Sequence, residues 1–265
     1  MLKDITLGQY FPGNSVVHRL DPRTKLILVI VFIAALFQAN GWVGYILVTL
    51  VTLSCVYISQ IPFKSIFKGL KPMLLIIALT GIINLFYTDG TPIRPGWIVT
   101  YEGIERAVQM ILRIALLIGG TFLLTYTTSP MELTDGLEKL LSPLNKIKVP
   151  VHELTLMMSM ALRFIPTLIE ETDKIMSAQK ARGADFETGG LVQRAKALLP
   201  VLVPLFVSAF RRADDLAVTM ESRCYHGSEG RTRMKQMRFA ARDFIALCLG
   251  AVFLGGMIIL KKSGL

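Results

Sequence analysis

Long stretches without a charged side chain are the feature of this 265-residue chain that most limits its fold. Residues 26–63, 72–88, 114–131 and 244–260 contain no Asp, Glu, Lys or Arg. An apolar run of about 17–25 residues is typical of a helix that crosses a bilayer. The chain is 52% hydrophobic, and soluble domains do not concentrate apolar residues in such blocks. The sequence therefore predicts an all-α, polytopic membrane protein.

The expected spans follow from these runs and from the turn residues between them. Residues 26–63 would extend roughly 57 Å as one helix, nearly two hydrocarbon cores, and Gln38-Ala39-Asn40-Gly41 divides them. We expect five spans, at about residues 24–39, 42–60, 72–88, 104–127 and 243–260. Three regions result: an N-terminal transmembrane region (1–129), a region of long amphipathic helices (130–242) and a C-terminal transmembrane helix (243–265). We name residues 130–242 the coupling region.

Basic residues are distributed unevenly between the expected spans, and the formal net charge is +10. They precede the first span (Lys3, Arg19, Arg23, Lys25), separate the second from the third (Lys64, Lys68, Lys71) and precede the last (Arg231, Arg233, Lys235, Arg238, Arg242), whereas the third and fourth are separated by Arg94 alone. The positive-inside rule then predicts a cytoplasmic N-terminus and coupling region and an outside C-terminus. We expect no nucleic-acid partner, because no basic motif has interleaved aromatic residues.

Two runs in the coupling region end alike. The first begins near Val151 and ends at Ala181, Arg182 and Gly183, which we name the first tip. The second begins near Leu191 and ends at Ser222, Arg223 and Cys224, the second tip. The two arginines are 41 residues apart, and an aspartate precedes each by nine residues. We expect two long helices, with Gly183 ending the first and Gly227 just past the second.

The composition of the tips indicates docking. A guanidinium offers five donors in a rigid fork, and small neighbouring residues let a partner's backbone approach. Each tip is therefore suited to an acidic or carbonyl-lined groove of a partner. The alternative is an ordinary solvated arginine.

Other candidate sites are weaker. The histidines at positions 18, 152 and 226 are scattered, and Cys55, Cys224 and Cys248 form no paired spacing, so we expect no metal site, disulfide or cofactor. The chain has no phosphate-binding loop of the Gly-x-x-x-x-Gly-Lys type, and any energy must come from another subunit. Arg113 lies deep in the fourth span, where it could pair with a neighbouring helix, snorkel outward or contact a substrate.

Several motifs resemble the transmembrane T component of energy-coupling factor transporters, importers of the ATP-binding-cassette class. The similarity covers essentially the whole chain and includes Asp21-Pro22-Arg23-Thr24-Lys25-Leu26, Leu162-Arg163-Phe164-Ile165-Pro166 and Met220-Glu221-Ser222-Arg223. In that family, Xaa-Arg-Xaa motifs at the ends of coupling helices dock two ATPase subunits. The resemblance implies this role for Ala181, Arg182 and Gly183 and for Ser222, Arg223 and Cys224, although Cys224 stands where glycine is common.

The function that this resemblance implies is that of a non-catalytic coupling subunit. It would link two cytoplasmic ATPases, which bind ATP and magnesium, to a membrane-embedded substrate-binding S component for uptake of vitamins or other micronutrients. Two alternatives stay open. A conventional importer permease would bind substrate within its own spans, and a membrane enzyme acting on lipid-linked diphosphates would need a clustered acidic metal site.

Overall fold

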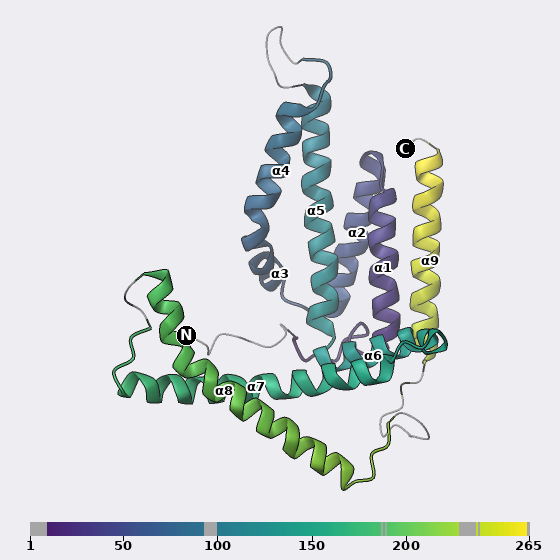
Figure 1. The fold of residues 1–265 in the computed structure, drawn as a ribbon. Helices are drawn as coiled ribbons and strands as arrows, with labels where there is room; N and C mark the ends of the chain where they lie inside the picture. Colours follow the sequence, from purple (N-terminus) through teal and green to yellow (C-terminus); the bar gives the residue numbers. More distant parts are fainter. Residues whose placement is uncertain are drawn as a thin grey trace. The chain divides into compact units, whose positions relative to one another are not determined.

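The computed structural model describes residues 10–92, 100–186, 188, 190–227, 237 and 239–263. These residues form helices and no named strand, with one isolated bridge between Pro92 and Thr100. The α-helices are α1 (Pro22–Gln38), α2 (Gly41–Ser59), α3 (Phe63–Leu70), α4 (Leu74–Tyr87), α5 (Tyr101–Thr127), α6 (Pro130–Leu141), α7 (Val151–Ala181), α8 (Leu191–Glu221) and α9 (Ala241–Lys262) (Figure 1). Two short 3₁₀ helices, η1 (Lys71–Met73) and η2 (Ser142–Ile147), follow α3 and α6.

The chain divides into two compact units. One comprises residues 8–139 and 236–265 and contains α1 to α5, nearly all of α6, and α9. The other comprises residues 1–7 and 140–235 and contains α7 and α8. The loop expected to hold Arg94 and Trp97 falls at residues 93–99, outside the described residues, as do most of the basic residues expected before the last span.

Within the described residues, five helical segments are long and apolar enough to cross a membrane, which confirms an all-α polytopic protein. They are Gly41–Ser59, Phe63–Tyr87, Tyr101–Thr127, Val192–Glu221 and Ala241–Lys262. This set of segments differs from the five expected spans in two ways. Helix α1 has 17 residues, the short end for a span, and α8 adds a long apolar segment within the coupling region.

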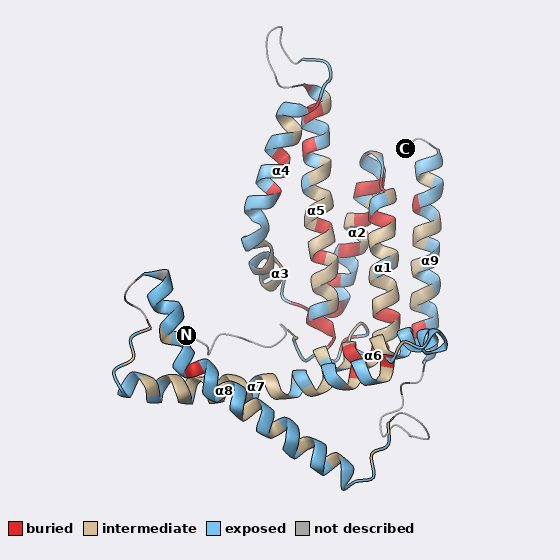
Figure 2. Cartoon of the chain, viewed as in Figure 1, coloured by how far each residue is buried: buried red, intermediate tan, exposed pale blue. Residues whose placement is uncertain are grey.

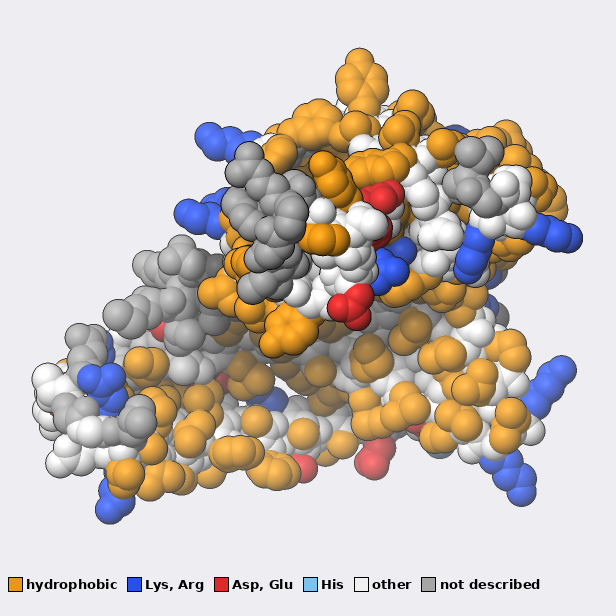
Figure 3. All heavy atoms as spheres, turned by 90° about the horizontal axis from the view of Figure 1, so that it is seen from above, with side chains coloured by type: hydrophobic (Ala, Val, Ile, Leu, Met, Phe, Trp, Pro, Cys, Tyr) orange, Lys and Arg blue, Asp and Glu red, His pale blue; other side chains and the backbone are white. Residues whose placement is uncertain are grey.

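The core of the larger unit joins α1, α2, α5 and α9. Its buried side chains are small or apolar: Ala35, Leu36, Ala39, Tyr45, Val48, Leu116 and Met257. The opposite faces are also apolar and lie exposed, with Ile30 of α1 66% and Val252 of α9 73% accessible. A helix that is apolar all round belongs in a membrane. Figure 2 shows how few residues are buried on these helices, and Figure 3 shows hydrophobic side chains over much of the visible surface.

Polar side chains fix the start of α1. Asp21 is its N-cap and accepts from the Arg23 backbone N–H, and Pro22 takes the first helical position, where a missing N–H costs nothing. Asp243 accepts from the backbone N–H groups of Asp21 and Ala240, each at 2.8 Å, and so ties α1 to α9. The Lys25 ammonium donates to the Thr127 carbonyl at the end of α5, at 2.9 Å. The motif at residues 21–26 is therefore a junction between three helices.

Proline does not break the two long helices of the smaller unit. Pro166 lies within α7, and Pro200 and Pro204 lie within α8. A proline inside a helix removes a hydrogen bond and usually kinks or breaks the helix. Instead α7 and α8 each continue over 31 residues. This length carries both arginines to helix ends.

Candidate functional site

The first tip closes α7 with a Schellman motif. The Gly183 N–H donates to the Lys180 carbonyl at 3.0 Å, and the Ala184 N–H donates to the Gln179 carbonyl at 2.9 Å. Gly183 adopts a φ of 89°, which is the left-handed conformation that this motif needs. Arg182 is therefore the last residue before the reversal, as the glycine in the sequence predicted.

The second tip repeats this geometry 41 residues later. The Cys224 N–H donates to the Glu221 carbonyl at 2.9 Å, and the Tyr225 N–H donates to the Met220 carbonyl at 3.1 Å. Cys224, with a φ of 55°, holds the left-handed position. Cys224 therefore reverses the chain after α8, and Gly227 lies three residues farther on. Arg182 and Arg223 occupy the same position in two equivalent backbone motifs.

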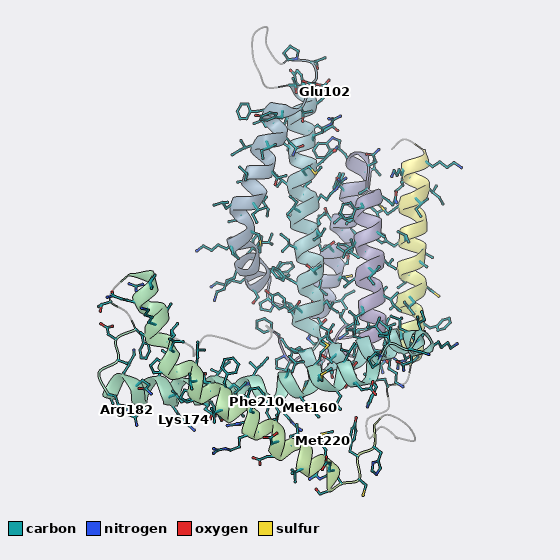
Figure 4. All side chains as sticks on the ribbon, viewed as in Figure 1. Glu102, Met160, Lys174, Arg182, Phe210 and Met220 are labelled. Atoms are coloured by element: carbon teal, nitrogen blue, oxygen red, sulfur yellow. The ribbon has the colours of Figure 1, made fainter. Side chains whose placement is uncertain are left out.

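Both arginines are available to a partner. Each is exposed, and neither guanidinium makes an ion pair or hydrogen bond with the part of the chain that the structure describes. Ala181, Ser222 and Cys224 beside them are also exposed. A cation at a helix C-terminus is favoured by the partial negative charge of the last carbonyls. Figure 4 shows Arg182 at the end of α7, with Lys174 farther back on the same helix.

The two helices meet at equivalent positions. The Arg212 guanidinium of α8 lies 2.7 Å from a Glu171 carboxylate oxygen of α7, and the Ser208 hydroxyl donates to the other oxygen at 2.5 Å. Glu171 and Arg212 are themselves 41 residues apart, so each precedes its own arginine tip by 11 residues. At about 1.5 Å per residue, each arm extends roughly 16 Å from this ion pair. The candidate site is thus a crossing of α7 and α8, from which two helical segments of equal length, the arms, extend to Arg182 and Arg223.

A second contact compensates one of the prolines. Because Pro204 has no N–H, the Pro200 carbonyl loses its helical donor. The Gln179 side-chain amide of α7 donates to this carbonyl at 3.4 Å. Gln179 also supplies a backbone carbonyl to the closing motif of the first tip. One residue therefore connects the end of α7 to the body of α8.

The outer face of α8 is strongly apolar. Its exposed side chains include Val203, Phe206, Val207 and Phe210, which line a shallow depression together with Arg211 and Asp214. Figure 4 shows Phe210 midway along α8. On α7, Met157 and Met158 are exposed as well. A contiguous apolar surface of this kind marks a contact with another protein or with a membrane.

Arg113 has partners within the helical bundle. Its guanidinium donates to the Ala39 carbonyl at 3.3 Å, just after the end of α1. The same group lies 5.9 Å from the ring centroid of Phe37 and 5.7 Å from that of Tyr45. Pairing with a neighbouring helix, one of the expected roles, therefore accounts for Arg113. Among the described residues, no group of His, Cys, Asp or Glu could hold a metal ion.

Sequence reasoning identified the tips but missed the crossing. Nothing in the spacing of one helix shows which side chain it will meet on another. A usable signal was present, since Glu171 and Arg212 share the 41-residue offset of the arginines and have opposite charges. The left-handed Cys224 had no comparable signal, because non-glycine residues seldom adopt positive φ.

Known proteins similar to this chain are membrane subunits of transporters. The family described as cobalt transport protein, CbiQ, matches residues 13–234. The energy-coupling factor transporter transmembrane protein EcfT of Ruminiclostridium cellulolyticum is 54% identical over 263 residues, 98% of each chain. The EcfT protein of Bacillus subtilis is 50% identical over 246 residues, 92% of this chain and 93% of the relative.

These likenesses and the fold together define the class: the chain is an all-helical, multi-pass membrane subunit of a transporter. It belongs to the CbiQ family, and it is the T component of an energy-coupling factor transporter. The resemblance drawn from residues 21–26, 162–166 and 220–223 is confirmed, and the conventional permease and the lipid-diphosphate enzyme are not favoured.

Proposed function

We propose that this T component couples two cytoplasmic ATPase subunits to a membrane-embedded S component. One observation carries the proposal most directly: Arg182 and Arg223 end two helices in the same backbone motif, at equal distances from one ion pair. Two equivalent arms suit two similar partners. Each guanidinium would enter an acidic or carbonyl-lined groove on one ATPase, with its small neighbours allowing close approach.

The T component itself would be non-catalytic. ATP and magnesium would be bound by the ATPases, because this sequence has no phosphate-binding loop. Movement of the ATPase subunits would shift the two arms, and the ion pair between Glu171 and Arg212 would keep them moving as one piece. The S component would contact the exposed apolar surface of α7 and α8, because such a surface suits an apolar partner.

The orientation follows from the basic residues. The N-terminus and the coupling region would face the cytoplasm, where the ATPases are, and the C-terminus would lie outside. Substrate choice, among vitamins or other micronutrients, would belong to the S component.

Affinity purification of the tagged chain from its native membranes tests this proposal. We expect two ATPase subunits and one small integral membrane protein per chain, identified by mass spectrometry of the intact complex. Recovery of a single ATPase subunit, or of ATPases without a further membrane protein, would contradict it. Labelling of introduced cysteines tests the orientation: a site at residues 92–96 should react from outside, and a site at residues 188–193 after permeabilisation alone.

A further inference from the structure

Helix α3 joins α2 to α4 and carries three different stripes along its length. Residues four apart lie one above the other on a helix. Phe63 and Phe67 therefore form an aromatic stripe, Lys64 and Lys68 a basic stripe beside it, and the pair at positions 65 and 69 a stripe of small residues. The lysine-containing segment between the second and third expected spans is thus an amphipathic helix.

The small-residue stripe fixes how α3 sits on α5. The Tyr126 hydroxyl donates to the Ser65 carbonyl at 3.2 Å. A Cβ atom on Gly69 would lie 2.5 Å from the Phe122 ring and 3.0 Å from the Tyr126 hydroxyl, so the helices touch where glycine allows it. The rings of Phe122 and Tyr126 stack at 5.6 Å beneath this contact. With this stripe turned inward, the aromatic and basic stripes are left on the outer surface.

The two outer stripes are exposed in the part of the chain that the structure describes. Phe63 is 48% exposed and Phe67 72% exposed. Lys64, Lys68 and Lys71 are exposed and make no ion pair or hydrogen bond there. No acidic residue occurs in the sequence between Asp21 and Asp89. The surface therefore combines exposed aromatic rings with a local excess of three positive charges.

We propose that this surface of α3 binds the anionic headgroups of membrane phospholipids, with Phe63 and Phe67 inserted among the acyl chains. Aromatic rings and lysines on adjacent faces of a short helix suit the boundary between headgroups and hydrocarbon. The three lysines complement phosphate charge. Another protein subunit is a poorer occupant, because lysine is depleted from the cores of protein interfaces.

The consequence for the transporter is a lipid-anchored connection between α2 and α4. Because α3 also packs on α5 through Gly69, lipid bound at the lysines would hold the inner ends of these helices at a fixed depth. This role is separate from docking at the arginine tips and does not depend on it.

A tryptophan reporter in the full-length chain tests the proposal. Replacing the two native tryptophans (Trp42→Phe, Trp97→Phe) and introducing Phe67→Trp leaves one fluorophore on the aromatic stripe. The protein is reconstituted in phosphatidylcholine vesicles with increasing fractions of brominated phosphatidylglycerol or brominated phosphatidylcholine. We expect the brominated phosphatidylglycerol to quench with an association constant about fivefold higher, the advantage of roughly one lysine near a charged surface.

Three matched variants show whether α3 provides this preference. The triple change Lys64→Ala, Lys68→Ala and Lys71→Ala should bring the two association constants to within about 1.5-fold. A control with the same loss of charge elsewhere, Lys146→Ala, Lys174→Ala and Lys196→Ala, should keep the preference. Replacing the three α3 lysines by arginine should keep it too, which separates charge from any effect on insertion.

Several outcomes would overturn the proposal. Equal quenching by the two brominated lipids in the parent protein would remove the charge preference. An unchanged preference in the triple alanine variant would place it elsewhere on the chain. Absence of quenching by either lipid would mean that protein covers the aromatic stripe. Loss of the preference on adding millimolar soluble glycerol phosphate would assign the lysines to a free phosphate instead of a bilayer.

Discussion

The ends of α7 and α8 share one backbone motif but hold different residues at its most demanding position. In both, the N–H groups of two successive residues turn back to carbonyls of the last helical turn, and an arginine stands just before the reversal. Gly183 provides the left-handed residue of the first tip, whereas Cys224 provides that of the second. Glycine adopts this conformation freely, but an L-residue with a Cβ atom is disfavoured there by about 1–2 kcal/mol.

This difference shows that the position of the arginine is maintained even where the local sequence opposes it. Residues with strained backbones persist when the surrounding structure determines them, and they occur often at functional sites. The surroundings of the arginines also differ, with Lys180 two positions before Arg182 and Glu221 two positions before Arg223. The two tips therefore hold an equivalent cation in unequal electrostatic settings.

The largest expected effect comes from removing the arginine that each tip contains. Arg182→Ala or Arg223→Ala alone should weaken assembly or coupling, because losing one partner of a desolvated charge contact costs about 2–5 kcal/mol. The double variant should release or uncouple both ATPases while the chain still inserts and folds. Co-purification of the ATPases and substrate uptake in membrane vesicles measure both effects.

Controls for this experiment lie on the same helices. Lys174→Ala and Lys196→Ala remove a positive charge from each arm away from its tip and should leave assembly unchanged. Arg→Lys at the tips should rescue partly, because an ammonium keeps the charge but lacks the planar fork. A double alanine variant with wild-type ATPase content and uptake would show that the tips do not dock the ATPases.

The second prediction concerns Cys224, the position at which the second tip differs from the first. A close contact with a partner's backbone tolerates a smaller residue but not a much larger one, since overpacking costs about 1–3 kcal/mol or more. Cys224→Gly should therefore retain uptake, and Cys224→Trp should lose most of it at equal expression. Uptake in vesicles, normalised to protein content, gives the ratio. Full activity of the tryptophan variant would mean that the second tip is not closely packed.

The sequence was sufficient for some of these features and insufficient for others. Uncharged runs located the apolar helices, because each crossing needs about 17–25 apolar residues whatever its neighbours are. The tips could be found because each places an arginine between two small residues at the end of a long amphipathic run. The docking role of Arg182 and Arg223 stays a prediction, since the structure contains no partner chain.

The missing features depend on contacts between distant residues. A proline inside a helix removes a hydrogen bond and costs about 3 kcal/mol, and the sequence of α8 alone does not show what compensates Pro204. The Gln179 amide, from α7, supplies a donor to the carbonyl left free at Pro200. Helix α3 was not predicted, because its amphipathic pattern spans only two turns and its support comes from Phe122 and Tyr126 on α5. Neither contact has a local signal.

The third prediction tests whether the ion pair between Glu171 and Arg212 stabilises the crossing of α7 and α8. Glu171→Ala or Arg212→Ala should each lower stability by about 1 kcal/mol or less, because the Arg212 side chain is 38% exposed and solvent weakens such pairs. The charge exchange, Glu171→Arg with Arg212→Glu, should recover much of the loss if the pair itself matters. Melting temperatures of the purified chain should fall by about 2–4 °C or less in the single variants. A charge exchange that melts below both of them would contradict this role.

The last prediction exchanges the left-handed residues of the two tips. Gly183→Cys places a Cβ atom at a φ of 89° and should lower the melting temperature by about 2–4 °C, corresponding to roughly 1 kcal/mol. Cys224→Gly relieves the strain at 55°, but glycine also gains freedom in the unfolded chain, worth about 0.5–1 kcal/mol. The rise in melting temperature should therefore be smaller than the fall in the reciprocal variant. Ala181→Cys is the control for adding a thiol, because Ala181 lies one residue before Arg182 and inside the helix. This variant should change the melting temperature by less than about 2 °C. If Gly183→Cys melts no lower than this control, the left-handed position carries no strain, and the two tips differ in sequence without differing in stability.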